Sequence, residues 1–169
     1  MSAERIYYGE VKWQDWYFYI GATDKGICFI SSKPSWENGA DKWIEKQFPN
    51  GVLKENESRI QPYKKQLIEY AEGNRQVFQL SLDLRGTPFQ KSVWQKLIEI
   101  PYGETSTYSE IAEKIGKPNA VRAVALAIGK NPVLIIVPCH RVIRKNGDLS
   151  GFREGILMKK KLLQLEHFT

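Results

Sequence analysis

The chain has 169 residues, of which 42% are hydrophobic and 26% charged, a composition typical of a globular protein with one ordinary domain or two small ones. Its two cysteines are too few for a disulfide framework, and no apolar run is long enough to cross a membrane. The first residues lack the basic start and apolar stretch of a signal peptide. We therefore expect a protein of a reducing, intracellular compartment.

The net charge of +6 is unevenly distributed along the chain. Residues 1–83 carry 11 basic and 12 acidic side chains, whereas residues 84–169 carry 14 basic and 7 acidic ones. A basic surplus confined to one half suggests a polyanionic partner for that half, most often nucleic acid. A solvated basic surface explains the surplus equally well, so charge alone leaves the partner open.

The first 83 residues are predicted to form a small α/β domain with a mainly antiparallel sheet. Aromatic and β-branched residues, interrupted by short polar turns, predict strands over residues 5–31. The pattern then predicts a helix over 36–48, a helix over 62–72 with Pro62 near its start, and a short strand over 77–82.

The aromatic side chains of this half could form a platform on which bases stack. They lie on apolar strands in a half without a basic surplus, which favours packing in the core. Cys28 stands in a run of apolar residues and is expected to be buried as a small hydrophobic side chain.

Beyond residues 85–88 the apolar residues follow a helical period. The sequence Thr107–Glu110 is a capping signal for a helix. A short helix, a turn containing Gly116 and a second helix together predict a helix-turn-helix. The helices expected in this half cover residues 89–98, about 108–115, about 119–128 and 156–165.

The second helix of this pair is thin, because alanines stand at positions 120, 123, 125 and 127. Small side chains let a helix backbone approach closely, and Arg122 near its beginning could enter a DNA groove. A tight contact between helices, with Arg122 in a surface ion pair, is the competing interpretation, and the helix alone does not decide between them.

A candidate reactive cysteine follows an apolar run. Residues 133–137 predict a buried strand, which Pro138 ends so that Cys139 stands at its exit. A neighbouring imidazole and positive charge raise the thiolate fraction of a cysteine, and His140 and Arg141 follow directly. Glu166 in the last helix could orient the imidazole. An inert buried cysteine beside a hydrogen-bonded histidine is the alternative.

The second half of the chain resembles the O6-alkylguanine-DNA alkyltransferases, also called methylated-DNA–protein-cysteine methyltransferases. The first half matches that family only in its length and its outline of strands and helices. The matching motifs occur in the family's order: Gly86–Gln90, Ile100–Gly103, Tyr108, Arg122–Val124, Asn131–Val133, Pro138–Val142, Gly151–Arg153 and Glu166.

The resemblance implies DNA repair by one irreversible transfer per molecule. The alkyl group of an O6-alkylguanine, flipped out of double-stranded DNA, would move to the sulfur of Cys139. His140 would deprotonate the thiol through a water molecule, and Glu166 would hold His140 in the required tautomer. Asn131 would brace the turn that shapes the site. Tyr108 would line the pocket, help to rotate the target phosphate and supply the proton to the departing base.

The resemblance also implies how DNA and the flipped base are held. Arg122 would fill the space that the base leaves in the stack, and the helix carrying it would enter the minor groove with little sequence preference. Further DNA contacts are expected from Ser109, Ala123 and Ala125. The pocket would include Ile128, Val142, Phe152 and Arg153. Arg141 is left open between a buried contact with an acidic group and a contact with substrate.

Family likeness further implies two domains, residues 1–83 and 84–169, the second mainly helical and winged-helix-like. No cofactor and no metal are expected. The expected partner is double-stranded DNA with no membrane contact, and the expected state is a monomer. Cooperative binding and activity on O4-alkylthymine are left open. We expect the cytoplasm, with association to the nucleoid through DNA, or the nucleus if the source is eukaryotic.

Some positions depart from the family pattern. Where glycine is common on the second helix, this chain has Ala125 and Leu126, and Leu126 is expected to face the core. Leu134 and Phe152 stand where some members have a proline and a tyrosine. Both positions belong to the expected pocket, so the resemblance does not imply that bulky alkyl groups are accepted. The rival functions are a cysteine hydrolase that turns over, with Cys139, His140 and Glu166 as its triad, and a DNA-binding regulator without chemistry.

Overall fold

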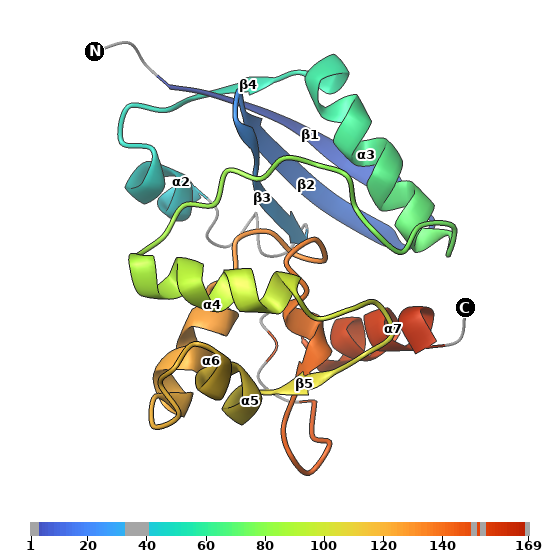
Figure 1. Cartoon of the computed structure of the whole chain (residues 1–169). Coiled ribbons are helices and arrows are strands. Elements are labelled where there is room, and N and C mark those ends of the chain that lie inside the picture. Colours follow the sequence, from blue (N-terminus) through green and yellow to red (C-terminus); the bar gives the residue numbers. More distant parts are fainter. Residues whose placement is uncertain (1–3, 33–40, 150–151, 153–154, 168–169) are drawn as a thin grey trace. The chain divides into compact units, whose positions relative to one another are not determined.

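The computed structural model describes residues 4–32, 41–149, 152 and 155–167 (Figure 1). The chain divides into two compact units, Met1–Arg85 and Gly86–Thr169. The expected fold class is confirmed, because the first unit is a small mixed sheet with helices and the second is mainly helical. No helix among the described residues combines the length and apolar character that a membrane crossing requires.

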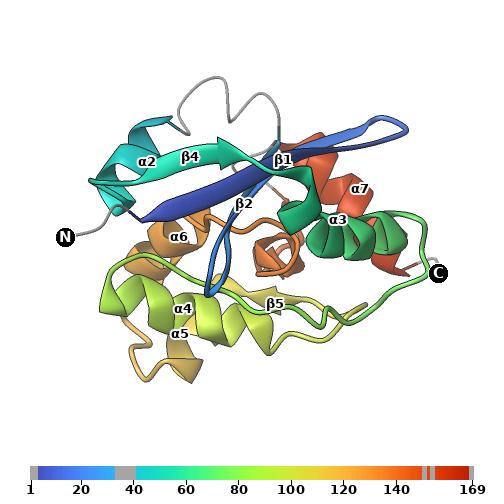
Figure 2. The same cartoon turned by 90° about the horizontal axis from the view of Figure 1, so that it is seen from above.

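The first unit is built on a four-stranded sheet in the order β3-β2-β1-β4. The strands predicted over residues 5–31 are confirmed as β1 (Arg5–Trp13), β2 (Trp16–Thr23) and β3 (Gly26–Ser32), which pair antiparallel. A fourth strand, β4 (Val52–Glu55), was not predicted and pairs parallel to β1 at the edge (Figure 2). Its four residues alternate too briefly to give a strand signal.

Two helices cover opposite faces of this sheet. Gly9 of β1 faces α3 (Glu57–Ala71), where an added Cβ would lie 3.2 Å from Ile60. Ile6, three residues earlier and so on the other face, packs with Ile44 of α2 (Asp41–Gln47). Cys28 is fully buried in the same cluster as Ile6 and Ile44, as expected. Trp16, Phe18 and Tyr19 are also buried, so these aromatics belong to the core.

One of the two helix predictions in this half needs correction at its start. The helix α3 begins at Glu57 rather than Pro62, because the Asn56 side chain caps it by accepting from the backbone N–H of Arg59. Pro62 lies inside the helix, where it is exposed and water can reach the carbonyl that its missing N–H leaves free. The helix expected over 36–48 is described only as α2, since 36–40 lie outside the described residues.

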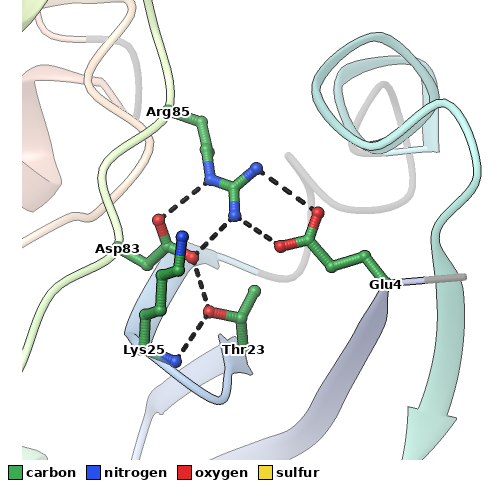
Figure 3. A network of polar contacts seen from close by, with 5 residues as sticks. All are labelled: Glu4, Thr23, Lys25, Asp83 and Arg85. Atoms are coloured by element: carbon green, nitrogen blue, oxygen red, sulfur yellow. Dashed lines mark hydrogen bonds and ion pairs between the residues drawn. The ribbon is translucent and has the colours of Figure 1, made fainter. Parts of the chain in front are cut away.

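The strand predicted over 77–82 is wrong. Only Leu82 makes an isolated bridge, to Ile27, and Val77 is 70% exposed. Polar contacts hold the following segment (Figure 3): Asp83 accepts from Thr23 at 2.5 Å and from Arg85 at 2.9 Å, and Arg85 also pairs with Glu4. Burial raises the pKa of Asp83, but hydrogen bonds from Arg85 and Thr23 outweigh it and place that pKa below its ordinary value.

The second unit begins with α4 (Pro88–Ile98), which Thr87 caps in a reciprocal capping box with Gln90. The Trp94 indole donates to the carbonyl of Ala127 at 2.8 Å, which ties α4 to α6 (Val121–Gly129). Gly86 is required beside this ring, because a Cβ there would lie 2.5 Å from it. The remaining elements are β5 (Ser106–Thr107), α5 (Tyr108–Lys114), the 3₁₀ turn η2 (Cys139–Arg141), β6 (Val142–Ile143) and α7 (Ile156–His167).

The predicted strand over 133–137 is also wrong, although the segment is largely buried as expected. Its backbone forms consecutive turns, with Ile135 in the left-handed region at φ 72° and the N–H of Val137 donating to the carbonyl of Val133. The Asn131 side chain bridges these turns, donating to the carbonyl of Val137 and accepting from the N–H of Val133. Side-chain hydrogen bonds therefore replace a ladder here.

Candidate active site

Cys139 opens the turn η2, directly after the segment braced by Asn131. Its N–H donates to the carbonyl of Val137 at 2.8 Å, and its side chain is 5% exposed. The turn continues into β6, whose Ile143 pairs in parallel with Thr107 of β5. Because Tyr108 follows Thr107, this pairing holds the start of α5 beside the segment that leaves the cysteine turn.

The residue after the cysteine belongs to a buried charged cluster. His140 Nε2 lies 2.6 Å from Glu166 Oε2, and both side chains are essentially inaccessible. Arg141 donates to both oxygens of Glu166, at 2.8 and 3.0 Å, and to the carbonyl of Ile100 at 2.7 Å. The structure therefore places Arg141 against an acidic group, one of the two positions that the sequence left open.

This cluster fixes the protonation state of the imidazole. Burial lowers the pKa of His140 below its ordinary 6.5; Glu166 opposes this effect, and the charges of Arg141 and Lys159 add to it. A neutral imidazole beside a carboxylate must carry its proton on Nε2 and donate it, which leaves a lone pair on Nδ1. Within the described residues Nδ1 is buried without a hydrogen-bond partner, so it is the atom available to accept a proton.

A small cavity lies beside the cysteine, with room for about one water molecule at about 10 Å³. A larger molecule could enter only if the lining side chains moved apart. The cavity is lined by Tyr108, Ile128, Gly129, Asn131, Leu134, Cys139, Phe152 and Lys159. Burial raises the pKa of the Tyr108 phenol, which keeps it protonated at neutral pH and able to donate.

Tyr108 also lines a second and larger space, a groove of about 810 Å³. Arg122 and Ala125 line this groove from α6, and Ser109 lines it from α5. Ala123 of α6 is exposed but not among the lining residues. The groove thus brings together the two helices of the predicted helix-turn-helix, with a cation on the second one.

The expected orientation of Leu126 is wrong. Its side chain is 68% exposed and lines the groove one helical turn from Arg122, because Val124, Ala127 and Ile128 take the buried face of α6. Residues four apart share one face of a helix, so Leu126 extends the face that Arg122 presents. The thin helix therefore carries one bulky apolar side chain on its open face.

Sequence reasoning missed several residues of these two spaces. Arg144, Lys145 and Asn146, in the turn that follows β6, also line the groove. Lys159 lines the cysteine cavity from α7 and is 1% exposed. The Arg-Lys pair is a basic signal that could have been noticed, whereas nothing in the sequence distinguishes Lys159 from its neighbours Lys160 and Lys161. Val142 is fully buried in β6, and Arg153 lies outside the described residues.

The fold and this site define a class of DNA methyltransferases. Residues 6–84 match the ribonuclease-like domain, and residues 88–168 the DNA binding domain, of the 6-O-methylguanine DNA methyltransferase family. The chain belongs to this family. It is 48% identical over 161 residues to the inducible methylated-DNA–protein-cysteine methyltransferase of Bacillus subtilis, across 95% of this chain and 90% of that protein.

Solved structures agree with this assignment. The Mycobacterium tuberculosis OGT in complex with DNA is similar with a TM-score of 0.79 and 36% identity, across 96% of this chain and 93% of that one. The O6-methylguanine-DNA methyltransferase of Pyrococcus kodakaraensis is similar with a TM-score of 0.67 and 25% identity, across 95% and 98% of the two chains.

Proposed function

We propose that this protein repairs DNA by moving the methyl group of O6-methylguanine onto its own Cys139, once per molecule. The observation that carries the proposal is the buried relay beside the cysteine, in which Arg141 and Glu166 hold a neutral His140 with Nδ1 free to accept. Alkyl transfer to a cysteine needs a thiolate and a base that is ready at neutral pH, and this relay supplies the base.

The proposed transfer moves one proton and one methyl group at the cysteine. His140 Nδ1 takes the thiol proton, directly or through one water, and the thiolate sulfur attacks the methyl carbon. The sulfur–carbon bond forms as the carbon–oxygen bond breaks, and its electron pair stays with the guanine. Tyr108 lines the cavity and remains protonated, so it gives a proton to the departing base. The thioether product has no good leaving group, so the protein is not regenerated.

The damaged base reaches the cysteine from the groove. We propose that double-stranded DNA binds along the groove and that the target nucleotide rotates past Tyr108, the side chain common to both spaces, into the cavity. Leu134, Ile128 and Phe152 then surround the base. The backbone groups of Cys139, Val142 and Arg153 are proposed to bind its edge. Activity on O4-methylthymine would use the same path.

We propose a DNA-bound monomer as the working form. The DNA complex of the M. tuberculosis protein shows that a relative of this fold binds DNA. Each chain of the present protein holds its own cysteine, base and groove, so we propose that one copy is sufficient for repair. We also propose that the protein acts in the compartment that contains the DNA. Sedimentation with and without a duplex measures the number of copies and any cooperative loading.

Replacing Arg122 is expected to separate base extrusion from chemistry. Arg122 is exposed in the groove, where we propose that it fills the gap left by the base. Arg122→Ala should slow methyl transfer from duplex DNA about tenfold to hundredfold, corresponding to a few kcal/mol of unstacking, and leave transfer from the free base nearly unchanged. Single-turnover rates on both substrates, with Lys91→Ala as the control on α4, measure this. Equal losses on both substrates would refute the role.

Salt dependence is expected to locate the DNA surface. If the groove holds phosphates, the logarithm of the binding constant should fall linearly with the logarithm of salt concentration. Arg144→Gln and Lys145→Gln should each make that slope shallower by about one and weaken binding to all sequences alike. Fluorescence anisotropy with a labelled duplex measures the slopes, again with Lys91→Gln as control. A flat response, or unchanged slopes, would mean that this basic turn is only solvated.

A further inference from the structure

A lysine is buried beside the reactive cysteine. Lys159 stands in the first turn of α7 and is 1% exposed, whereas its neighbour Lys160 is exposed. Lysine is almost never fully buried without a compensating partner, because desolvation disfavours its ammonium group. Its side chain lines the same small cavity as Cys139, and that cavity has room for about one water molecule at about 10 Å³.

Arg141, the cation that follows His140 in the chain, is already committed. Arg141 is held by Glu166 and by the carbonyl of Ile100, so its guanidinium belongs to the relay. The charged or titratable groups that interact with Lys159 are Cys139 and His140 of η2 and Arg144 and Asp148 after β6, and Tyr108 of α5 lines the same cavity. The Phe152 ring, which lines the same cavity, lies 5.9 Å from the Nζ of Lys159.

An anion in the cavity would stabilise the ammonium form of Lys159. Burial lowers the pKa of Lys159, and Arg144 lowers it further, whereas the charges of Cys139 and Asp148 raise it. An ammonium and a thiolate in one poorly hydrated cavity stabilise each other, because the attraction between opposite charges grows as the dielectric constant falls.

We propose that Lys159 is a positioning residue that stabilises the thiolate form of Cys139 from the wall of their shared cavity. The proposal rests on the function above, in which the thiol proton goes to His140. Lys159 keeps its three protons throughout and makes or breaks no covalent bond. Once the sulfur becomes a neutral thioether, the ammonium no longer has an anion to stabilise. This fits a protein that reacts once.

The test is a direct titration of the cysteine in the whole protein without DNA. Cysteine labelled with ¹³C at Cβ reports its ionisation by NMR, and Cys139→Ala assigns the two signals. Lys159→Met, which keeps the length and removes the charge, should raise the pKa of Cys139 by about one unit or more, and Lys159→Arg should restore most of the difference. Cys28 is the internal control, since burial raises its pKa to about 12 and no variant should move it.

A reciprocal titration keeps the test decisive if Lys159→Met does not fold. If the ammonium lowers the pKa of the thiol, the thiolate must raise the pKa of the ammonium by the same amount. Lysine labelled with ¹³C at Cε should therefore show one signal whose pKa falls in Cys139→Ala relative to the unchanged protein. The proposal would be overturned if no lysine signal behaved in this way. It would also be overturned if the pKa of Cys139 were the same in Lys159→Met and in the unchanged protein.

Neither titration uses DNA, so the outcome separates this inference from the proposed function. A Cys139 pKa that depends on Lys159 in a protein that transfers no methyl group would leave the inference standing and remove the function. Methyl transfer with normal kinetics in Lys159→Met, together with an unmoved thiol pKa, would leave the function standing and remove the inference.

Discussion

Incubation with a duplex that contains O6-methylguanine is expected to leave one methyl group on Cys139 and none on Cys28. Cys139 has a cavity, a base and a neighbouring cation, whereas Cys28 is fully buried and burial raises its pKa to about 12. Intact-mass and peptide mass spectrometry measure the site and the number of methyl groups. The amount of repaired guanine should rise to the amount of protein and then stop.

Matched variants decide between this function and its rivals. Cys139→Ala should abolish transfer while leaving DNA binding intact, and Cys28→Ala should transfer normally after allowance for any loss of stability. Product in large excess over protein would indicate the hydrolase instead. Binding of damaged DNA with no repair by the unchanged protein would indicate the regulator. Repair that survives Cys139→Ala would show that another residue accepts the group.

Removing Arg141 is expected to have the largest effect on stability. Glu166 is nearly inaccessible and Arg141 donates to both of its oxygens, so Arg141→Met leaves a buried carboxylate without its guanidinium partner. Breaking a buried ion pair from one side costs about 3–5 kcal/mol of folding free energy. Urea unfolding measures this loss, and Lys160→Met, on the exposed side of α7, is the control.

The same variant tests the relay. Without Arg141 the carboxylate is free to turn or to take up a proton, so His140 loses the partner that fixes its tautomer and methyl transfer slows in the fraction that stays folded. Stability within about 0.5 kcal/mol of the unchanged protein would contradict the buried pair. A normal transfer rate in the folded variant would contradict the role of Arg141 in holding Glu166.

Stability is also expected to fall as the pH decreases below about 6.5. Burial lowers the pKa of His140 in the folded protein, so below 6.5 the unfolded chain binds a proton that the folded chain does not bind. This contribution is complete above 6.5 and is lost progressively as the pH falls toward the folded-state pKa. The pH profile of urea unfolding, compared between the unchanged protein and His140→Gln, isolates it, and identical slopes would contradict the neutral buried imidazole.

Local patterns determined much of the second unit. The capping signal at Thr107 marked the start of α5 correctly, because a cap is a short-range contact. The same local logic failed at Pro62 and over residues 77–82, where an asparagine cap upstream and a polar network around Asp83 decide the backbone. A strand of four residues such as β4 exists only through its neighbour in the sheet.

The sequence by itself determined the class of chemistry. A cysteine followed by a histidine, within a series of motifs in the family's order, can be recognised without knowing which residues surround them in the fold. Only the tertiary structure decided which groups serve them. Arg141 and Glu166, 25 positions apart, meet in a buried pair; Lys159 is selected from three consecutive lysines by its direction on α7; Leu126 turns outward. Each outcome depends on desolvation and packing by residues distant in the chain, and no local pattern contains that information.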